Sequence, residues 1–195
     1  SEVSRGEKAK LLLDEPIIKE AFDKYLVLVF EPQEASAQTL RSFVRQFGPL
    51  FVHHSDDGVI PVDEAPEVLQ MLKEPEGDRL FGGVCWHADV TFRKPAGYLS
   101  ALHAKQLPPV GGDTLFASMS AAYDGLSLGM QRYLDGLIAV HDFSHGFKES
   151  LAEPGGRERL ADAVAANPPV RHPVVQTHPE TGKKVLFVNA LFTTH

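Results

Sequence analysis

One apolar segment of the sequence brings an imidazole and a carboxylate close together. His87 and Asp89 are separated by a single residue, and their neighbours include Trp86, Val90 and Phe92. On a β-strand, residues i and i+2 point to the same face, so the two polar side chains would converge on one point. A histidine and a carboxylate are two of the three ligands of a facial site that leaves positions on Fe(II) open for a co-substrate and O2. The segment therefore predicts a strand that carries two iron ligands.

The same residues also allow a purely structural interpretation. A short H-x-D pattern arises by chance, and His87 could be a buried, hydrogen-bonded histidine with Asp89 as its partner. Three features favour the metal site. An unpaired carboxylate in an apolar strand is costly. The polar and irregular stretch 52–83 comes before the pair and suits an active-site loop or lid. Thr114 follows in a Gly-Gly-Asp-Thr turn, where its hydroxyl can bind a carboxylate.

Composition and charge narrow the class of protein. The chain has 195 residues, of which 43% are hydrophobic, so residues 1–195 suit one globular domain. A net charge of −7 argues against a nucleic-acid surface, and no apolar stretch is long enough to cross a membrane. Residues 1–10 lack the apolar segment of a signal peptide. Cys85 is the only cysteine, which excludes an internal disulfide and fits a reducing, cytoplasmic setting.

The remaining sequence alternates between strand-like and helix-like segments. Apolar periodicity, capping residues and terminating glycines predict helices over residues 10–24, 36–47 with Ser36 as N-cap, 118–137 broken near Ser127, and 155–166. Short apolar runs bounded by turn residues predict strands over residues 25–30, 86–92, 97–105, 140–147, 174–178 and 185–189. The last two strands flank the turn 179–182 and read as a hairpin. The sum predicts a mainly β fold with inserted helices around a double-stranded β-helix (jelly-roll) core.

Several motifs resemble those of one known family. Residues 86–92, Trp-His-Ala-Asp-Val-Thr-Phe, resemble the W-H-[TS]-D-V-T-F signature of the taurine dioxygenase (TauD/TfdA) family. Residues 107–115 resemble its L-P-x-x-G-G-D-T-L motif, and residues 121–127 its A-A-Y-x-x-L-S motif. Residues 172–194 resemble its H-P-V-V-x-T-H-P, T-G, L-F-V-N and F-T-T blocks. The motifs follow one another in the family's order, from about Lys24 to His195.

The resemblance implies a fold, a reaction and a set of site residues. The fold is a double-stranded β-helix, and the reaction uses Fe(II) and O2 to convert the co-substrate 2-oxoglutarate to succinate and CO2 while a C–H bond is hydroxylated. The substrate would be a small anion, namely a sulfonate, a sulfate ester or an aryloxyalkanoate, and the protein a possible homo-oligomer. The implied iron ligands are His87 and Asp89, and Thr114 would contact 2-oxoglutarate. The implied substrate-binding residues are His53, Val90, Phe143 and Phe192.

The sequence also departs from the family pattern. Ala88 replaces the usual Thr or Ser between the two ligands, where the side chain should point away from the metal. Asp56 and Gly83 stand where taurine enzymes have a Tyr and an Asn, which argues against taurine as the substrate. The family's second histidine ligand and its 2-oxoglutarate-binding arginine lie beyond the F-T-T block. We therefore expect an incomplete copy of the polypeptide and a jelly-roll open at its C-terminal side, with His195 a weak substitute for the missing ligand.

Alternatives to this assignment stay open at the level of sequence. A chain with two iron ligands could be a non-catalytic or degenerate jelly-roll binding module, or a cupin-like metalloenzyme that does not use 2-oxoglutarate. Phe143 and Phe192 suit a plain aromatic core as well as a pocket wall. His172 is interpreted as a structural or surface histidine, and His141 as a structural histidine that could instead line the rim of the pocket near Phe143, because histidine is often half-buried without any catalytic role.

Overall fold

A computed structural model describes residues 15–52, 59–71 and 85–195. The chain divides into two compact units, each of which is described by itself. The first combines Ser1–His53, Ile60–Gln70 and Ala101–Thr114, and the second His54–Val59, Met71–Ser100 and Leu115–His195. Among the described residues, no helix has the length and apolar character needed to span a membrane.

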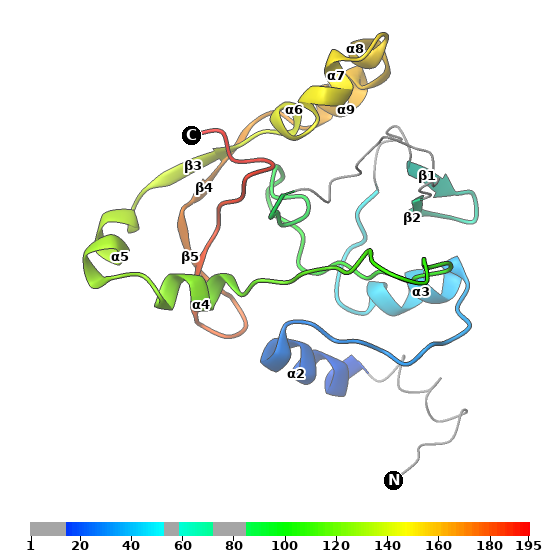
Figure 1. Cartoon of the computed structure of the whole chain (residues 1–195), viewed down its shortest axis with the longest axis horizontal. Coiled ribbons are helices and arrows are strands. Elements are labelled where there is room, and N and C mark those ends of the chain that lie inside the picture. The colour runs from blue at the N-terminus through cyan, green and yellow to red at the C-terminus, as the bar shows by residue number, and fades with distance from the viewer. Residues whose placement is uncertain (1–14, 53–58, 72–84) are drawn as a thin grey trace. The chain divides into compact units, whose positions relative to one another are not determined.

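Among the residues that the structure describes, the first unit contains two helices and a two-stranded sheet (Figure 1). They are α2 (Glu15–Tyr25), α3 (Ala37–Arg45), β1 (Val59–Val62) and β2 (Ala65–Met71). As predicted, Ser36 caps α3, and its side chain accepts a hydrogen bond from the backbone N–H of Thr39 at 3.1 Å. Arg41 of α3 pairs with Glu67 of β2 at 2.9 Å, which ties the helix to the sheet.

The predicted strand over residues 25–30 is wrong. Helix α2 runs to Tyr25, and Leu26 then takes a left-handed backbone conformation with φ 66°. A residue with positive φ turns the chain out of the helix and does not start an extended strand. The apolar side chains that follow are partly or fully exposed, and Val29 is 92% exposed. The run is apolar, but it has no neighbouring strand with which to form a ladder in the described part of the chain.

Two further expectations fail for the same reason. Residues 97–105 form no strand, and Leu102 is 71% exposed. Conversely, β1 and β2 form a hairpin inside the stretch 52–83 that was predicted to be irregular. In both places the presence or absence of a pairing partner decides the structure, and the local residue preferences do not.

From Leu115 onward, the second unit has two short helices whose break was predicted correctly. Helix α4 (Met119–Asp124) starts at Ser118 and α5 (Leu128–Leu134) at Ser127, and each serine side chain accepts a backbone N–H from the first turn. Strand β3 (Ile138–His141) follows. It ends there because Asp142 caps α6 (Phe143–Gly146) through the N–H of Ser144 at 2.8 Å, so the strand predicted over 140–147 stops early.

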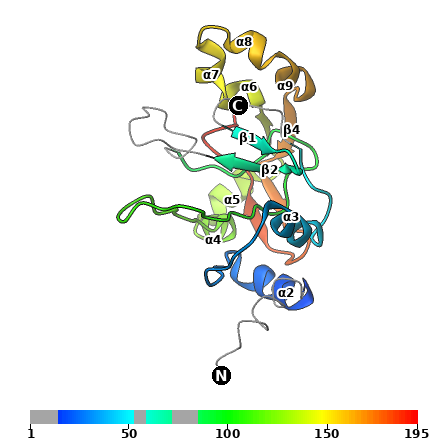
Figure 2. The same ribbon diagram turned by 90° about the vertical axis from the view of Figure 1, so that its right-hand side faces the viewer.

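Two antiparallel ladders and a helical cluster complete this unit. Strand β4 (Val170–Pro173) pairs with β3, with His141 opposite Val170 and Ala139 opposite His172. The predicted hairpin is confirmed as β5 (Val175–Thr177) paired with β6 (Lys184–Leu186). The helices that join β3 to β4 gather at one end of that ladder (Figures 1 and 2). They are α6, α7 (Lys148–Ala152), α8 (Gly156–Arg159) and α9 (Ala161–Ala166).

An aromatic cluster forms the core of the second unit. The ring of Phe92 lies edge-on to those of Phe143 and Phe192, with centroid distances of 5.2 and 4.8 Å. Only glycine fits at position 146, because any β-carbon there would collide with the ring of Phe192. The core thus packs α6 and the segment after β6 against the residues that directly follow Asp89.

The described elements mix helices with short strands that pair two by two. The mixed content agrees with inserted helices between strands. A complete jelly-roll barrel remains a prediction for the fold.

Candidate metal centre

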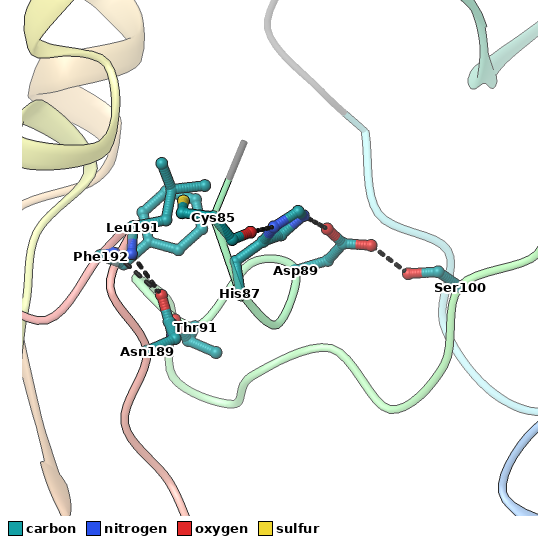
Figure 3. Close-up of polar contacts among 8 residues, drawn as sticks. All are labelled: Cys85, His87, Asp89, Thr91, Ser100, Asn189, Leu191 and Phe192. Atoms are coloured by element: carbon teal, nitrogen blue, oxygen red, sulfur yellow. Dashed lines mark hydrogen bonds and ion pairs between the residues drawn. The ribbon is translucent and has the colours of Figure 1, made fainter. Parts of the chain in front are cut away.

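His87 and Asp89 converge as predicted. Nε2 of His87 lies 3.5 Å from Oδ1 of Asp89, and their side chains are 31% and 55% exposed (Figure 3). The other ring nitrogen of His87, Nδ1, lies 3.0 Å from the backbone oxygen of Cys85. Because a carbonyl only accepts, Nδ1 donates to it, and in the neutral imidazole this leaves the lone pair on Nε2, beside the carboxylate. A neutral imidazole oriented in this way is the usual state of a histidine that binds a metal.

Ser100 orients the carboxylate. Its hydroxyl donates a hydrogen bond of 2.7 Å to Oδ2 of Asp89, which leaves Oδ1 on the side of His87 (Figure 3). Sequence reasoning did not identify Ser100. It sits in a segment interpreted as a strand, and no local pattern links it to a residue that lies 11 positions earlier. Each member of the pair therefore has one outward partner, which fixes the ring and the carboxylate relative to each other.

The reason given for this convergence was wrong. Residues 86–92 are not a strand, since residues 89–92 form a turn. Val90 has φ 57°, and the N–H of Arg93 donates to the carbonyl of Val90 at 3.1 Å. A β-branched residue rarely adopts a positive φ, and such a conformation costs on the order of 1–3 kcal/mol. The two side chains therefore meet where an irregular segment, residues 86–88, enters the turn, and not on a strand.

The turn is anchored in the interior of the second unit. Thr91 and Phe92 are only 2% and 6% exposed. The Thr91 hydroxyl contacts Nδ2 of Asn189 at 3.0 Å and Nδ1 of His141 at 2.9 Å. His141 is completely buried, and His172 is 5% exposed. These residues were interpreted only as structural or as part of a family motif, and the contact between them could not be read from the sequence.

Burial lowers the pKa of both of these histidines. For His141 the nearby His172 acts in the same direction, against a hydrogen bond with the Phe187 backbone. For His172 hydrogen bonds with the carbonyls of Thr91 and Arg93 oppose the effect of burial, and the charge of Lys94 adds to it. Both imidazoles are thus held in the neutral form beside the turn.

The predicted substrate-binding residues and Thr114, the predicted contact of 2-oxoglutarate, fall into three groups. Val90, Phe143 and Phe192 come together in the aromatic core, where the two phenylalanines are 3% and 4% exposed. Thr114 belongs to the first compact unit, whereas the ligand pair belongs to the second. His53 lies outside the described residues, as do Asp56, Gly83 and most of the stretch 52–83. The roles assigned to these residues remain predictions.

The two donor atoms of the pair fit an iron site. One imidazole nitrogen and one carboxylate oxygen are ligands that a non-haem Fe(II) site uses, and both are accessible and oriented. Within residues 15–52, 59–71 and 85–195, no group of three or more His, Cys, Asp or Glu side chains is placed to hold a metal ion. His195 therefore does not join the pair. Its Nδ1 contacts the hydroxyl of Thr194 at 3.0 Å, and its carbonyl accepts the N–H of Val140 at 2.7 Å.

Comparisons with known proteins point to one family. Residues 7–195 match the family model described as taurine catabolism dioxygenase TauD, TfdA family. An alpha-ketoglutarate-dependent 2,4-dichlorophenoxyacetate dioxygenase of Cupriavidus pinatubonensis is 33% identical over 190 residues, which is 89% of this chain and 63% of that protein. An alkylsulfatase of Acinetobacter baylyi is 31% identical over 178 residues, which is 90% of this chain and 54% of that protein.

Solved structures agree with these relatives. A taurine dioxygenase from Burkholderia xenovorans superposes with a TM-score of 0.62 at 27% identity, over all of this chain and 57% of its own. The structure of AAD-2 with Mn(II) and N-oxalylglycine superposes with a TM-score of 0.62 at 26% identity, over 98% of this chain and 63% of its own. The chain thus spans roughly three fifths of the length of these proteins.

Proposed function

Because the chain belongs to the taurine catabolism dioxygenase TauD, TfdA family, we propose that it is part of an Fe(II)- and 2-oxoglutarate-dependent dioxygenase. One observation carries the proposal: the oriented pair of His87 Nε2 and Asp89 Oδ1, 3.5 Å apart and open to solvent. Several relatives are named as alpha-ketoglutarate dioxygenases, and we propose the same activity for the protein that contains this chain.

In this function His87 and Asp89 hold the metal. The carbonyl of Cys85 keeps the His87 proton on Nδ1, and the hydroxyl of Ser100 keeps one Asp89 oxygen turned toward the histidine. When bound, Fe(II) with 2-oxoglutarate and O2 supplies the oxidation that converts R–H to R–OH and releases succinate and CO2. The task of the chain is to orient these partners and to exclude water.

Other residues are assigned on the family resemblance. The hydroxyl of Thr114 donates a hydrogen bond to a carboxylate of 2-oxoglutarate. Val90, Phe143 and Phe192 form an apolar wall that shields the substrate carbon from water, which is supported by their common place in the core. His53 binds the anionic group of the substrate. We further propose that residues 1–195 belong to a single jelly-roll dioxygenase domain and that stretch 52–83 forms its active-site lid.

The substrate class follows from the relatives. Their printed names include a dichlorophenoxyacetate dioxygenase, an alkylsulfatase and a sulfonate dioxygenase. These activities share a small organic anion with a C–H bond near its acidic group or ether oxygen. We therefore propose a sulfonate, a sulfate ester or an aryloxyalkanoate as the substrate class.

An anaerobic titration tests the iron site directly. The protein is titrated with Fe(II) and 2-oxoglutarate without oxygen, and the visible spectrum is followed for the weak charge-transfer band of the chelated co-substrate. The band is expected in the unaltered protein and lost in His87→Ala. The loss of Fe(II) affinity should exceed the about 10- to 100-fold that accompanies removal of a residue that only orients a ligand. The matched control is His178→Ala, which removes an imidazole from the β5–β6 turn.

The same experiment separates the two candidate functions. If the unaltered protein shows no band at saturating Fe(II), the two-donor site is not assembled and a binding module is the better description. If the band survives His87→Ala, the assigned ligand is wrong. Succinate release under air, measured with one sulfonate, one sulfate ester and one aryloxyacetate, then identifies the substrate class.

A further inference from the structure

A chain of buried and half-buried polar groups adjoins the ligand pair. Thr91 comes two residues after Asp89, and its hydroxyl contacts Asn189 at 3.0 Å and His141 at 2.9 Å. The three residues come from separate parts of the second unit: the turn, the segment after β6, and the last position of β3. We call these three residues the Thr91 clamp.

The direction of each hydrogen bond in the clamp can be assigned. Oδ1 of Asn189 accepts the backbone N–H groups of Leu191 and Phe192 at 3.2 and 2.9 Å (Figure 3). The amide nitrogen of Asn189 is therefore the atom that faces Thr91 and donates to it. The Thr91 hydroxyl can then donate its own proton to Nδ1 of His141. In that neutral tautomer the imidazole proton is on Nε2, which lies 3.3 Å from the hydroxyl of Thr193.

Backbone contacts hold the same segment on both sides of the ligands. The N–H of Ala190 donates to the carbonyl of Trp86, just before His87. Nε2 of His172 lies 3.0 and 3.1 Å from the carbonyls of Thr91 and Arg93, so it donates to the backbone just after the turn. The ligand pair is thus bracketed by contacts with residues far along the chain.

The turn needs such support. Val90 has φ 57°, a conformation that a β-branched residue adopts only when its surroundings impose it. If the backbone at Val90 relaxed to an extended form, the chain would leave Asp89 in another direction, and the carboxylate would lose its place beside the Ser100 hydroxyl. The clamp grips the side chain next to Val90 and is shielded from water, because Thr91 and His141 are 2% and 0% exposed.

We propose that Thr91, with Asn189 and His141, positions the metal ligands by holding the turn at Val90. None of the three binds the metal, so they are positioning residues. The inference rests on the proposed function only where it concerns metal affinity. Its claim about the turn concerns the protein without metal.

The principal variant is Thr91→Val, which keeps the shape of the side chain and removes the hydroxyl. The first measurement is amide hydrogen exchange of the metal-free protein by NMR. We expect the N–H of Arg93, which closes the turn on Val90, to exchange at least about 10-fold faster relative to the N–H of His178, which bonds to Lys183 in the β5–β6 hairpin. Thr91→Ser restores the hydroxyl and should restore the slow exchange.

The second measurement is Mn(II) affinity by calorimetry. Thr91→Val should weaken it by about 10- to 100-fold, whereas Thr91→Ser should bind nearly as well as the unaltered protein. Leu160→Ala is the matched control. Leu160 is 1% exposed and does not belong to the aromatic core, so its truncation should lower overall stability but change neither the relative exchange of Arg93 nor Mn(II) affinity. If Thr91→Val does not fold, His141→Phe removes Nδ1 and keeps a ring against Phe187.

The outcomes separate the two proposals. Unchanged relative exchange at Arg93 in Thr91→Val, or an equal change in Leu160→Ala, overturns the clamp. Faster exchange with unchanged Mn(II) affinity overturns its role in positioning the ligands. If the unaltered protein binds no Mn(II), the proposed iron site fails, and the exchange measurement alone supports or overturns the hold of the clamp on the turn.

Discussion

The two compact units bury different kinds of side chain. In the first, the deeply buried residues are apolar, with Ile18, Phe43 and Ala65 below 9% exposed. In the second, an aromatic core is buried together with hydrogen-bonded polar groups: Thr91, which contacts His141 and His172, and Asn167, which donates to the carbonyl of Ala163. A buried polar group is tolerated only when it is paired, and its bonds have fixed directions. The second unit therefore allows fewer arrangements of its buried side chains and of the backbone that carries them than the first unit does.

This difference suits the place of the ligand pair. His87 and Asp89 remain open to solvent, and the residues directly after them are among the most buried in the unit. A site that must admit a metal and small molecules needs exposed donor atoms on a rigid support. Caps and a surface ion pair such as Arg41–Glu67 can hold a helix on a hairpin, but they define no comparable site.

The largest expected effect is a loss of stability on truncation of a buried phenylalanine, compared between one such residue in each unit. Phe192→Ala removes a ring that is packed against Phe92 and Phe147 and is 4% exposed, so the free energy of unfolding should fall by about 3–5 kcal/mol. Phe43→Ala should cost less, because its partner Phe30 is 42% exposed and its surroundings can collapse more easily. Urea unfolding followed by circular dichroism measures both. Equal losses would contradict the comparison.

An intermediate effect is expected from acid. Burial lowers the folded pKa of His141 and His172 below the ordinary value of about 6.5. Their contribution to stability is therefore fully present above about pH 6.5 and is lost as the pH falls through their folded values, by at most about 1.4 kcal/mol per pH unit for each group. The first unit should keep its structure until the pH falls into the range in which carboxyl groups titrate. Arg41 lowers the pKa of Glu67, so this ion pair is lost only below the ordinary carboxyl pKa of about 4.3.

Amide signals in β4 and α3, followed by NMR between pH 7 and pH 4, test this order. The signals of β4 should broaden or vanish at higher pH than those of α3. Replacement of His172 by Phe should shift the transition of β4 to lower pH. Simultaneous loss of both sets of signals in the unaltered protein would show that the two units do not differ in acid sensitivity.

The smallest expected effect comes from two helix caps, one in each unit, for which the two units should not differ. Ser36 and Ser127 accept the same type of backbone N–H at 3.1 and 3.2 Å, one in each unit. Ser36→Ala and Ser127→Ala should each cost about 1 kcal/mol, because a cap acts only within its own helix turn. Thermal unfolding of both variants is the measurement, with Ser→Asp at each position as the control that keeps an acceptor. A several-fold difference would mean that capping also depends on the surrounding unit.

Local signals in the sequence were sufficient for part of the structure. The cap of α3 at Ser36, the break between α4 and α5 at Ser127, and the β5–β6 hairpin were predicted because each depends on residues only a few positions apart. The convergence of His87 and Asp89 was likewise predicted from an H-x-D pattern and its neighbouring motifs, and the two side chains do meet, while their role as iron ligands stays a prediction.

Tertiary structure alone decided how those side chains meet. Residues 25–30, 86–92 and 97–105 have strand-like composition, but a strand also needs a partner, which composition does not reveal. The turn at Val90 depends on Thr91, whose hydroxyl partners lie 50 and 98 positions away at His141 and Asn189. The sequence thus determined which atoms are present to bind a metal. Contacts between distant residues determined their orientation, because only the folded chain brings these groups within hydrogen-bonding distance.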